Sequence, residues 1–135
     1  MSDHSENIVR QYFSELDRGR GTPAHMCTDD FVFHVAGFAL MDLAAAVEFG
    51  QIFFVGLPDL MHPLEHVIAQ GDTVAFRCRY EGTHTAAFMG APATGNAVSF
   101  QGIGFMRVAS DKIAEFWVSP DRMTMMQQVG LLPSA

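Results

Sequence analysis

The sequence predicts an α+β fold in which helices precede a run of antiparallel strands and pack on one face of a curved sheet. Two segments of the first half space their apolar residues with a helical period, whereas the second half alternates apolar and polar residues between short turns. The chain has 135 residues, of which 49% are hydrophobic and 17% are charged. This length and composition are typical of one domain with a substantial core, to which we assign residues 1–135.

The first half of the chain is predicted to contain two longer helices and one strand. Residues 3–19 repeat apolar side chains at helical spacing, up to the glycines that end the run. A short helix over residues 24–27 and a strand over residues 31–36 are expected next. Asp42 is a suitable N-cap for a helix that runs to about residue 54.

The second half is predicted to be mainly β-structure. Two hairpins are expected, each built from two alternating strands around a short turn. A long connection with several Gly and Pro residues separates the hairpins, and a last short helix ends at Gly130. The expected strands cover residues 60–69, 73–80, 97–108 and 113–118, the connection covers residues 82–95, and the helix covers residues 122–129.

The balance of charge argues against several classes of partner. Fifteen acidic and eight basic residues give a formal net charge of −7, so nucleic acid and anionic membranes are unsuitable ligands. The first residues lack the pattern of a signal peptide, and no apolar run reaches the roughly 18 residues of a membrane span. Cys27 and Cys78 stand alone without metal or redox spacing, which favours a reducing cytoplasm.

Large flexible and aromatic side chains are abundant. Twelve Phe and nine Met residues are many for a chain of this size. They fit a bulky core. Alternatively, part of them lines an internal pocket for a small hydrophobic molecule, because Met and Phe adapt well to irregular cavities.

The end of the last predicted strand presents one carboxylate. Asp121 follows Pro120 directly. In a desolvated pocket its pKa would rise and it could act as a general acid or base. As the N-cap of the last helix it would instead accept N–H groups and have a lowered pKa. If Val108 pairs with Ile113 across the turn, Pro120 lies opposite Gln101, and Gln101 could bond a substrate carbonyl.

A series of short motifs in the chain resembles a known family. The motifs are, in order, Pro58-Asp-Leu60, Gly71-Asp72, Gly82-Thr-His-Thr85, Gly90, Thr94-Gly95, Phe100-x-Gly102, Lys112-Ile113, Glu115-x-Trp117, Asp121 and Gln127-x-x-Gly130. In this order they resemble the SnoaL-like polyketide cyclases, or ester cyclases, of the nuclear transport factor 2-like superfamily, over about residues 5–133.

The resemblance implies a cone-shaped fold, with the N-terminal helices on the concave side of an antiparallel or mixed sheet. It also implies an enzyme that needs no cofactor or metal and closes a ring by intramolecular aldol condensation of an aromatic polyketide ester. In that chemistry Asp121 moves the proton beside a carbonyl, His84 assists, and Gln101 holds an oxygen. A homodimer packed through the exposed sheet is expected from the same resemblance.

Further residues are candidates for binding the substrate. His34 lies on the strand face opposite Phe31, Phe33 and Val35, and Trp117 could stack on a flat ligand. Candidates for the pocket wall are Phe88, Met89, Phe105 and Met106, although the sequence does not decide which face of each strand points inward.

One motif suggests zinc and is rejected on spacing. His62-Pro-Leu-Glu-His66 matches a pattern that binds zinc on a helix. In the predicted strand the two His residues lie roughly 13 Å apart, at about 3.3 Å per residue, which is too far for one metal ion. We therefore expect no metal site.

The sequence is consistent with two functions. The first is a cyclase-type enzyme, or a related isomerase or lyase, acting on an apolar oxygenated polycycle. The second is a non-catalytic module that binds a small hydrophobic ligand in the same cone. The enzyme requires Asp121 inside the cavity, whereas the binding module allows Asp121 to be an exposed helix cap.

Overall fold

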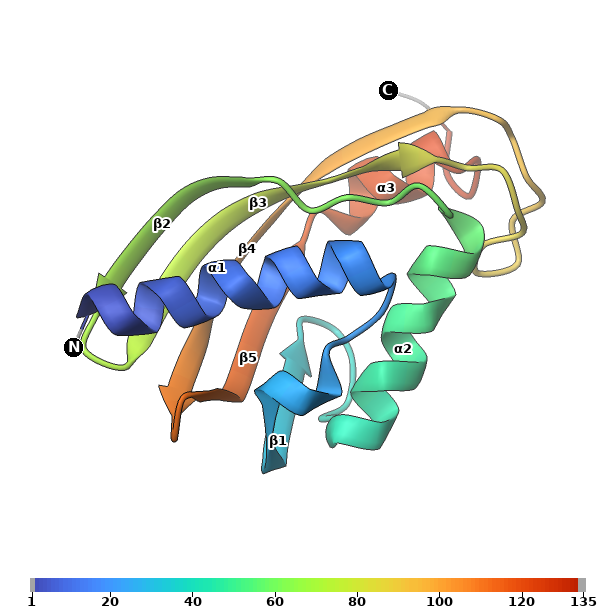
Figure 1. Cartoon of the computed structure of the whole chain (residues 1–135). Helices are drawn as coiled ribbons and strands as arrows, with labels where there is room; N and C mark the ends of the chain where they lie inside the picture. Colours follow the sequence, from blue (N-terminus) through green and yellow to red (C-terminus); the bar gives the residue numbers. More distant parts are fainter. Residues whose placement is uncertain (1, 134–135) are drawn as a thin grey trace.

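The computed structural model describes residues 2–133 and confirms the predicted α+β class (Figure 1). Within these residues no helix is both long enough and apolar enough to cross a bilayer. The elements are α1 (Ser2–Gly19), the 3₁₀ helix η1 (Ala24–Met26), β1 (Cys27–Val35), α2 (Leu43–Gly56), β2 (Leu64–Gln70), β3 (Thr73–Thr83), β4 (Ala97–Ala109), β5 (Lys112–Pro120) and α3 (Arg122–Gln128).

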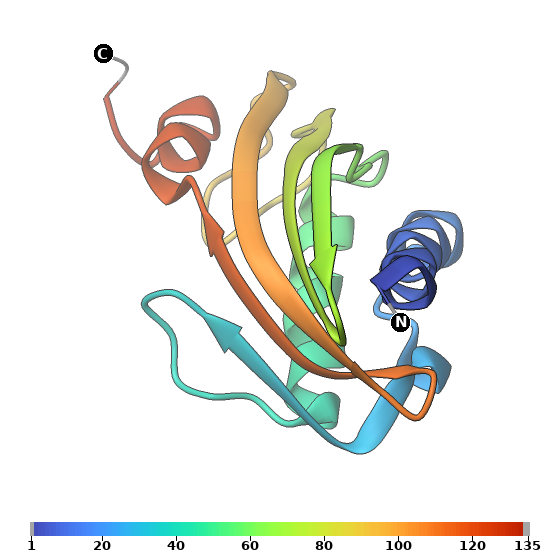
Figure 2. The same cartoon turned by 90° about the vertical axis from the view of Figure 1, so that its left-hand side faces the viewer.

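The five strands form one curved, unclosed sheet in the order β1-β5-β4-β3-β2. β1 runs parallel to β5, and the other neighbouring strands are antiparallel. Helices α1 and α2 lie on the same side of the sheet, and α3 follows the end of β5 (Figures 1 and 2). The opposite face of the sheet carries no helix among the described residues, so the two faces meet different surroundings.

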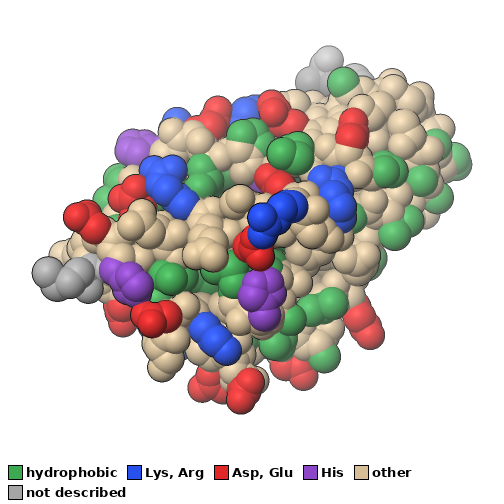
Figure 3. Space-filling view, viewed as in Figure 1, with side chains coloured by type: hydrophobic (Ala, Val, Ile, Leu, Met, Phe, Trp, Pro, Cys, Tyr) green, Lys and Arg blue, Asp and Glu red, His purple; other side chains and the backbone are tan. Residues whose placement is uncertain are grey.

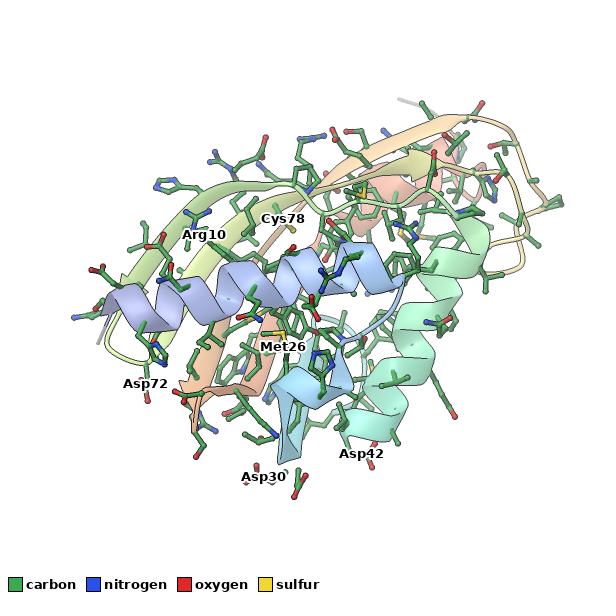
Figure 4. The ribbon with its side chains drawn as sticks, viewed as in Figure 1. Arg10, Met26, Asp30, Asp42, Asp72 and Cys78 are labelled. Atoms are coloured by element: carbon green, nitrogen blue, oxygen red, sulfur yellow. The ribbon has the colours of Figure 1, made fainter. Side chains whose placement is uncertain are left out.

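The helices begin and end close to the predicted residues, and two strands differ from prediction. Asp42 caps α2 by accepting the N–H of Ala45 at 2.9 Å (Figure 4). β1 starts four residues earlier than expected, at Cys27. β2 starts four residues later, at Leu64, because Pro63 just before it has no N–H to donate to a ladder.

The second hairpin contains a bulge that changes the predicted register. The pairing next to the turn is as predicted, but Pro120 lies opposite Gly102 rather than Gln101. The reason is that β5 has one extra, unpaired residue, Ala114, close to the turn. The shift moves every later pair of this hairpin by one position.

An aromatic cluster joins α1 to the sheet. The ring of Phe116 on β5 lies 4.8–6.3 Å from the rings of Phe33, Tyr12 and Phe13, and 5.7 Å from that of Phe76. Most of these contacts are edge-to-face or tilted, which is the favourable geometry for aromatic pairs. This cluster holds α1 over the middle of the concave face.

Close approach of β4 and β5 gives a test of the fold. Gly104 pairs with Val118, and a methyl group on Gly104 would overlap the carbonyl oxygen of Trp117. Backbone cannot move aside as a side chain can, so Gly104→Ala should lower the free energy of unfolding by about 1–3 kcal/mol. Urea denaturation measures the change.

Gly19→Ala is the matched control, because nothing lies within 4 Å of a methyl group there. It should leave stability unchanged or raise it by up to about 1 kcal/mol. Equal unfolding midpoints for the two variants would contradict the strand geometry.

Candidate active site

A cavity of about 300 Å³ lies between the helices and the concave face of the sheet. The alternation of β1 directs Phe31, Phe33 and Val35 into it. α2 adds further aromatic rings, and α3 closes one side. Eight of the twelve Phe residues line the cavity, namely Phe13, Phe31, Phe33, Phe38, Phe49, Phe53, Phe54 and Phe116. The lining therefore favours an apolar and aromatic ligand.

Few polar side chains reach this cavity. They are Tyr12, Thr22, His62, Tyr80 and Arg122. Among the described residues no carboxylate lines the cavity directly. In so apolar a space each polar group is a candidate for fixing or activating a ligand.

A buried carboxylate–imidazole pair stands at one wall. Asp17 Oδ1 lies 2.6 Å from Nδ1 of His62, and Asp17 Oδ2 accepts the backbone N–H of His62 at 2.9 Å. The two side chains are only 13% and 8% exposed. With the carboxylate on Nδ1, the proton of a neutral imidazole resides on Nδ1, and Nε2 carries the lone pair.

The second ring nitrogen of His62, Nε2, is unpaired. It makes no hydrogen bond to a described residue, and His62 lines the cavity. Its ring lies between Phe13, Phe54 and Tyr80, with ring centroids 6.3, 5.9 and 5.0 Å away. His62 is therefore an oriented base at the wall of an aromatic cavity.

Two tyrosines supply hydrogen-bond donors. Burial, assisted by the neighbouring Cys78, raises the pKa of Tyr80 well above its usual value. Burial is also the main reason that the pKa of Tyr12 is raised. Both hydroxyls therefore stay protonated at neutral pH. Tyr80 lines the cavity with its ring beside that of His62, and its hydroxyl, which lies near Cys78, keeps a proton that it can donate.

Arg20 holds together the two segments that carry the Asp17–His62 dyad. Its guanidinium donates to the carbonyl oxygens of Leu60, at 2.5 Å, and of Pro58, and it lies 4.6 Å from the ring centroid of Phe54. A third bond reaches the carbonyl oxygen of Asp17 at 3.2 Å. The end of α1 and the segment before His62 are therefore held in one geometry.

Asp121 lies outside the cavity, which corrects the expectation of a general base. Its carboxylate accepts the N–H of Thr124 at 3.2 Å and the Thr124 hydroxyl at 2.7 Å, and so caps α3. These bonds lower its pKa. An exposed carboxylate with a lowered pKa is a weak base, so the geometry fits the capping alternative.

His84 also lies outside the cavity lining. It is fully buried, and its Nδ1 accepts from the hydroxyl and the N–H of Thr94 at 2.9 and 3.3 Å. Its Nε2 is enclosed and without a partner among the described residues. The residue anchors the connection between β3 and β4 rather than facing a ligand.

Four predicted binding residues point to the other face of the sheet. His34 stacks on Trp117 with centroids 4.9 Å apart and bonds Glu115 at 2.8 Å. Phe105 is 51% exposed beside Trp117, and Gln101 alternates with inward residues of β4. Because Phe116 and Phe33 face inward, the residues that follow them must face outward.

The remaining wall candidates divide between core and cavity. Met89 lines the cavity and is 38% exposed. Phe88 and Met106 are buried and lie outside the lining, in the packed core. The sequence pattern does not separate these positions, because buried and lining residues share the same apolar character.

The sequence pattern does not link His62 to Asp17. It marks His62 only as part of a zinc motif, and no group of three metal-binding side chains lies together within residues 2–133. Asp17 follows Phe13 by one helical turn, at the edge of the apolar stripe of α1. An acid at that position was a usable signal, since the edge of the stripe faces neighbouring elements.

Comparison with protein families supports the motif-based resemblance. Residues 7–129 match the model of the SnoaL-like polyketide cyclase family. A search of curated proteins gives no match.

Several solved structures have the same fold. AclR, a proposed hydroxylase from Streptomyces galilaeus, is 21% identical with a TM-score of 0.90, over 100% of this chain and 90% of its own. IdmH, a proposed polyketide cyclase from Streptomyces antibioticus, is 27% identical with a TM-score of 0.82, over 93% and 98%. An epoxide hydrolase of LEH-like type from M. tuberculosis is 14% identical with a TM-score of 0.73, over 95% and 90%.

The capping role of Asp121 predicts a pH-dependent effect on stability. Asp121→Ala should lower the free energy of unfolding at pH 7 by about 0.5–1 kcal/mol, as for other lost N-caps. Because the pKa is lowered in the folded state, the charged cap stabilises above the unfolded pKa of about 4. That contribution disappears as the pH falls through the folded pKa, so the difference from wild type should narrow between about pH 5 and 2.

Chemical denaturation at several pH values measures this effect. Asp121→Asn is the control, because an amide still caps the helix but has no charge to titrate. A catalytic role would be restored to Asp121 if either variant kept full stability at pH 7 and lost activity.

Proposed function

Because the chain belongs to the SnoaL-like polyketide cyclase family, we propose that it is an enzyme that uses its own side chains for acid–base chemistry. The substrate class is an apolar, oxygenated polycyclic or aromatic molecule. The reaction is an intramolecular aldol cyclisation or a related isomerase or lyase step. The observation that carries this proposal is His62, oriented by the buried Asp17 at the wall of an aromatic cavity.

The proposed chemistry starts with proton removal. Nε2 of His62 takes a proton from the carbon beside a carbonyl, and the C–H electron pair forms the enolate. Tyr80 donates a hydrogen bond to the enolate oxygen, while Asp17 stabilises the imidazolium. The enolate carbon then attacks a second carbonyl carbon of the same molecule. The alkoxide that results takes the proton back from His62.

The apolar surroundings increase the effect of these groups. Charges and dipoles act more strongly where water is excluded and the lining is aromatic. The carboxylate of Asp17, 2.6 Å from Nδ1, is placed to stabilise the imidazolium that forms when Nε2 takes a proton. The dyad can therefore hold a proton transiently without being exposed to solvent.

The alternative is a non-catalytic module that holds a small hydrophobic ligand in the same cavity. Both functions use the aromatic lining. A binding module has no need of a base with a free nitrogen and a dedicated orienting carboxylate, and this pair favours the enzyme.

We also propose a second copy of the chain as the partner of the outer sheet face. In register across the five strands, the row Ile68, Ala75, Phe105, Trp117 and His34 faces outward. Ile68 and Phe105 are 59% and 51% exposed. Such a row of exposed apolar groups is typical of an interface.

We place this activity in a reducing compartment such as the cytoplasm. Cys27 and Cys78 are unpaired and buried. Burial raises the pKa of both thiols to about 12, so they remain protonated and unreactive at neutral pH.

The proposed base is tested by proton exchange. In D₂O the enzyme should accelerate exchange of the α-protons of 2-tetralone, a bicyclic ketone, as followed by ¹H NMR. His62→Gln should lower the rate by about 10²–10⁴-fold, the usual contribution of a general base. Asp17→Asn should also lower the exchange rate, because the imidazole loses its orienting partner.

His66→Gln is the matched control, since His66 is an exposed His of the same segment. It should exchange at the wild-type rate. Binding of 2-tetralone, measured by calorimetry, should survive in His62→Gln. Wild-type exchange by His62→Gln would refute the mechanism, and binding without any catalysed exchange would establish the binding module instead.

The proposed partner is tested by assembly. Phe105→Glu puts a charge in the centre of the outer row and should shift the wild-type dimer to monomer in sedimentation equilibrium. Met123→Glu is the control, because Met123 is 66% exposed on α3, away from the sheet. A monomeric wild type, or a dimer that tolerates Phe105→Glu, would contradict this interface.

A further inference from the structure

Arg122 differs from the other arginines in its partners. Five of the seven arginines pair with a glutamate: Arg10, Arg18, Arg77, Arg79 and Arg107. Figure 3 shows basic and acidic groups interspersed on the face that carries α1. Arg20 is held by backbone carbonyls. Arg122 lines the cavity, and it forms no ion pair with a described carboxylate.

The chain between β1 and α2 forms a cradle for this guanidinium. Nη1 of Arg122 donates to the carbonyl oxygen of Ala36 at 3.2 Å, and the guanidinium lies 4.7 Å from the ring centroid of Phe38. Between them, Gly37 has a φ of +86°, and a Cβ there would overlap Nη1. Three consecutive residues thus leave room for the guanidinium and hold it at the cavity.

Most of the donors of Arg122 remain free. A guanidinium has five N–H donors, and Arg122 uses one in a described hydrogen bond, the bond to Ala36. The side chain is exposed at the edge of the cavity, together with Phe38 and Met89, which are 40% and 38% exposed. The mouth of an apolar cavity therefore offers a fixed positive charge with a planar set of donors.

The sheet register separates Arg122 from His62. Pro120 at the end of β5 pairs with Gly102, Gly102 with Cys78, and Cys78 with Leu64 at the start of β2. Arg122 follows this row at one end, and His62 precedes it at the other. Three strand spacings of about 4.8 Å place the backbones of Pro120 and Leu64 roughly 14 Å apart. Arg122 and His62 both line the cavity, so one elongated ligand can reach both.

We propose that Arg122 binds a carboxylate of the substrate, so that the enzyme acts on a free apolar acid rather than on its neutral ester. The carboxylate lies at the mouth, against Arg122, and the reacting carbonyl lies deeper, beside His62. This assignment rests on the proposed function of the same cavity. Arginine forms two parallel charge-assisted bonds with a carboxylate, whereas an ester accepts only weaker neutral bonds.

The overall charge of the protein makes a local cation necessary for binding an acid. With a net charge of −7, the surface as a whole repels anions. An anionic ligand therefore needs a specific local cation, and Arg122 is the arginine of the cavity lining.

Binding of a matched acid and ester tests the proposal. The probes are 2-naphthylacetate and its methyl ester, titrated by calorimetry at pH 7. Wild type should bind the acid about tenfold or more tightly than the ester, which corresponds to about 1.4 kcal/mol or more. Arg122→Gln should abolish the preference while leaving ester affinity unchanged. Arg122→Lys should restore part of it.

Arg10→Gln is the matched control, because it removes the same charge from the exposed face of α1 (Figure 4). It should keep the preference for the acid. Added NaCl should weaken acid binding by wild type more than by Arg122→Gln, since the ion pair is exposed. Circular dichroism establishes that each variant is folded.

The outcomes separate this proposal from the catalytic one. Equal affinity of wild type for acid and ester, or a preference that survives Arg122→Gln, overturns the carboxylate site and leaves the His62 test standing. His62→Gln should retain the acid preference. If it does so while wild type fails to catalyse proton exchange, the carboxylate site stands and the catalytic function fails. Binding of neither probe overturns the carboxylate site, and the 2-tetralone exchange then decides the catalytic function by itself.

Discussion

The packing of α1 on the concave face is the constraint on which the site depends. Tyr12 and Phe13 meet Phe116 edge-on, near the middle of the sheet. Fixing this part of α1 fixes Asp17 one turn later, because helical residues four apart share a face. Asp17 in turn receives both the ring and the backbone N–H of His62. The hydrophobic effect that folds the domain therefore also determines where the base stands.

Burying the Asp17–His62 dyad is energetically unfavourable, and this explains the hydrogen bonds around it. A carboxylate that is only 13% exposed is unfavourable unless its oxygens are bonded. Asp17 uses both oxygens on His62, and Arg20 holds the adjoining segments through three carbonyl oxygens. These bonds satisfy polar groups that the fold would otherwise bury unpaired. They leave Nε2 of His62 as the unsatisfied atom of the pair, which is the condition a base requires.

The sequence predicts the helices and strands far better than it predicts which residues lie next to one another in space. Helical spacing and turn residues located all three helices and both hairpins, because these signals are local. The dyad joins residues 45 positions apart, and no local pattern encodes that contact. The sequence does not predict which face of a strand points inward, for a related reason. Phe116 and Trp117 are both aromatic, and only packing against α1 decides that Phe116 faces inward. The extra residue Ala114 likewise altered a register that regular pairing would have placed at Gln101.

The end of β5 contributes to the site through a helix cap and not through a catalytic carboxylate. Asp121 caps α3 through Thr124, and this cap fixes the first turn of the helix, in which Arg122 is the first residue. The carboxylate thus acts on the site through its neighbour, by directing the guanidinium toward the cradle of residues 36–38. The charge of Arg122 lies at the exposed edge of the cavity, where a charged group does not lose all of its contact with solvent. In the proposed mechanism, carboxylate binding and proton transfer are therefore divided between the two ends of one row of the sheet.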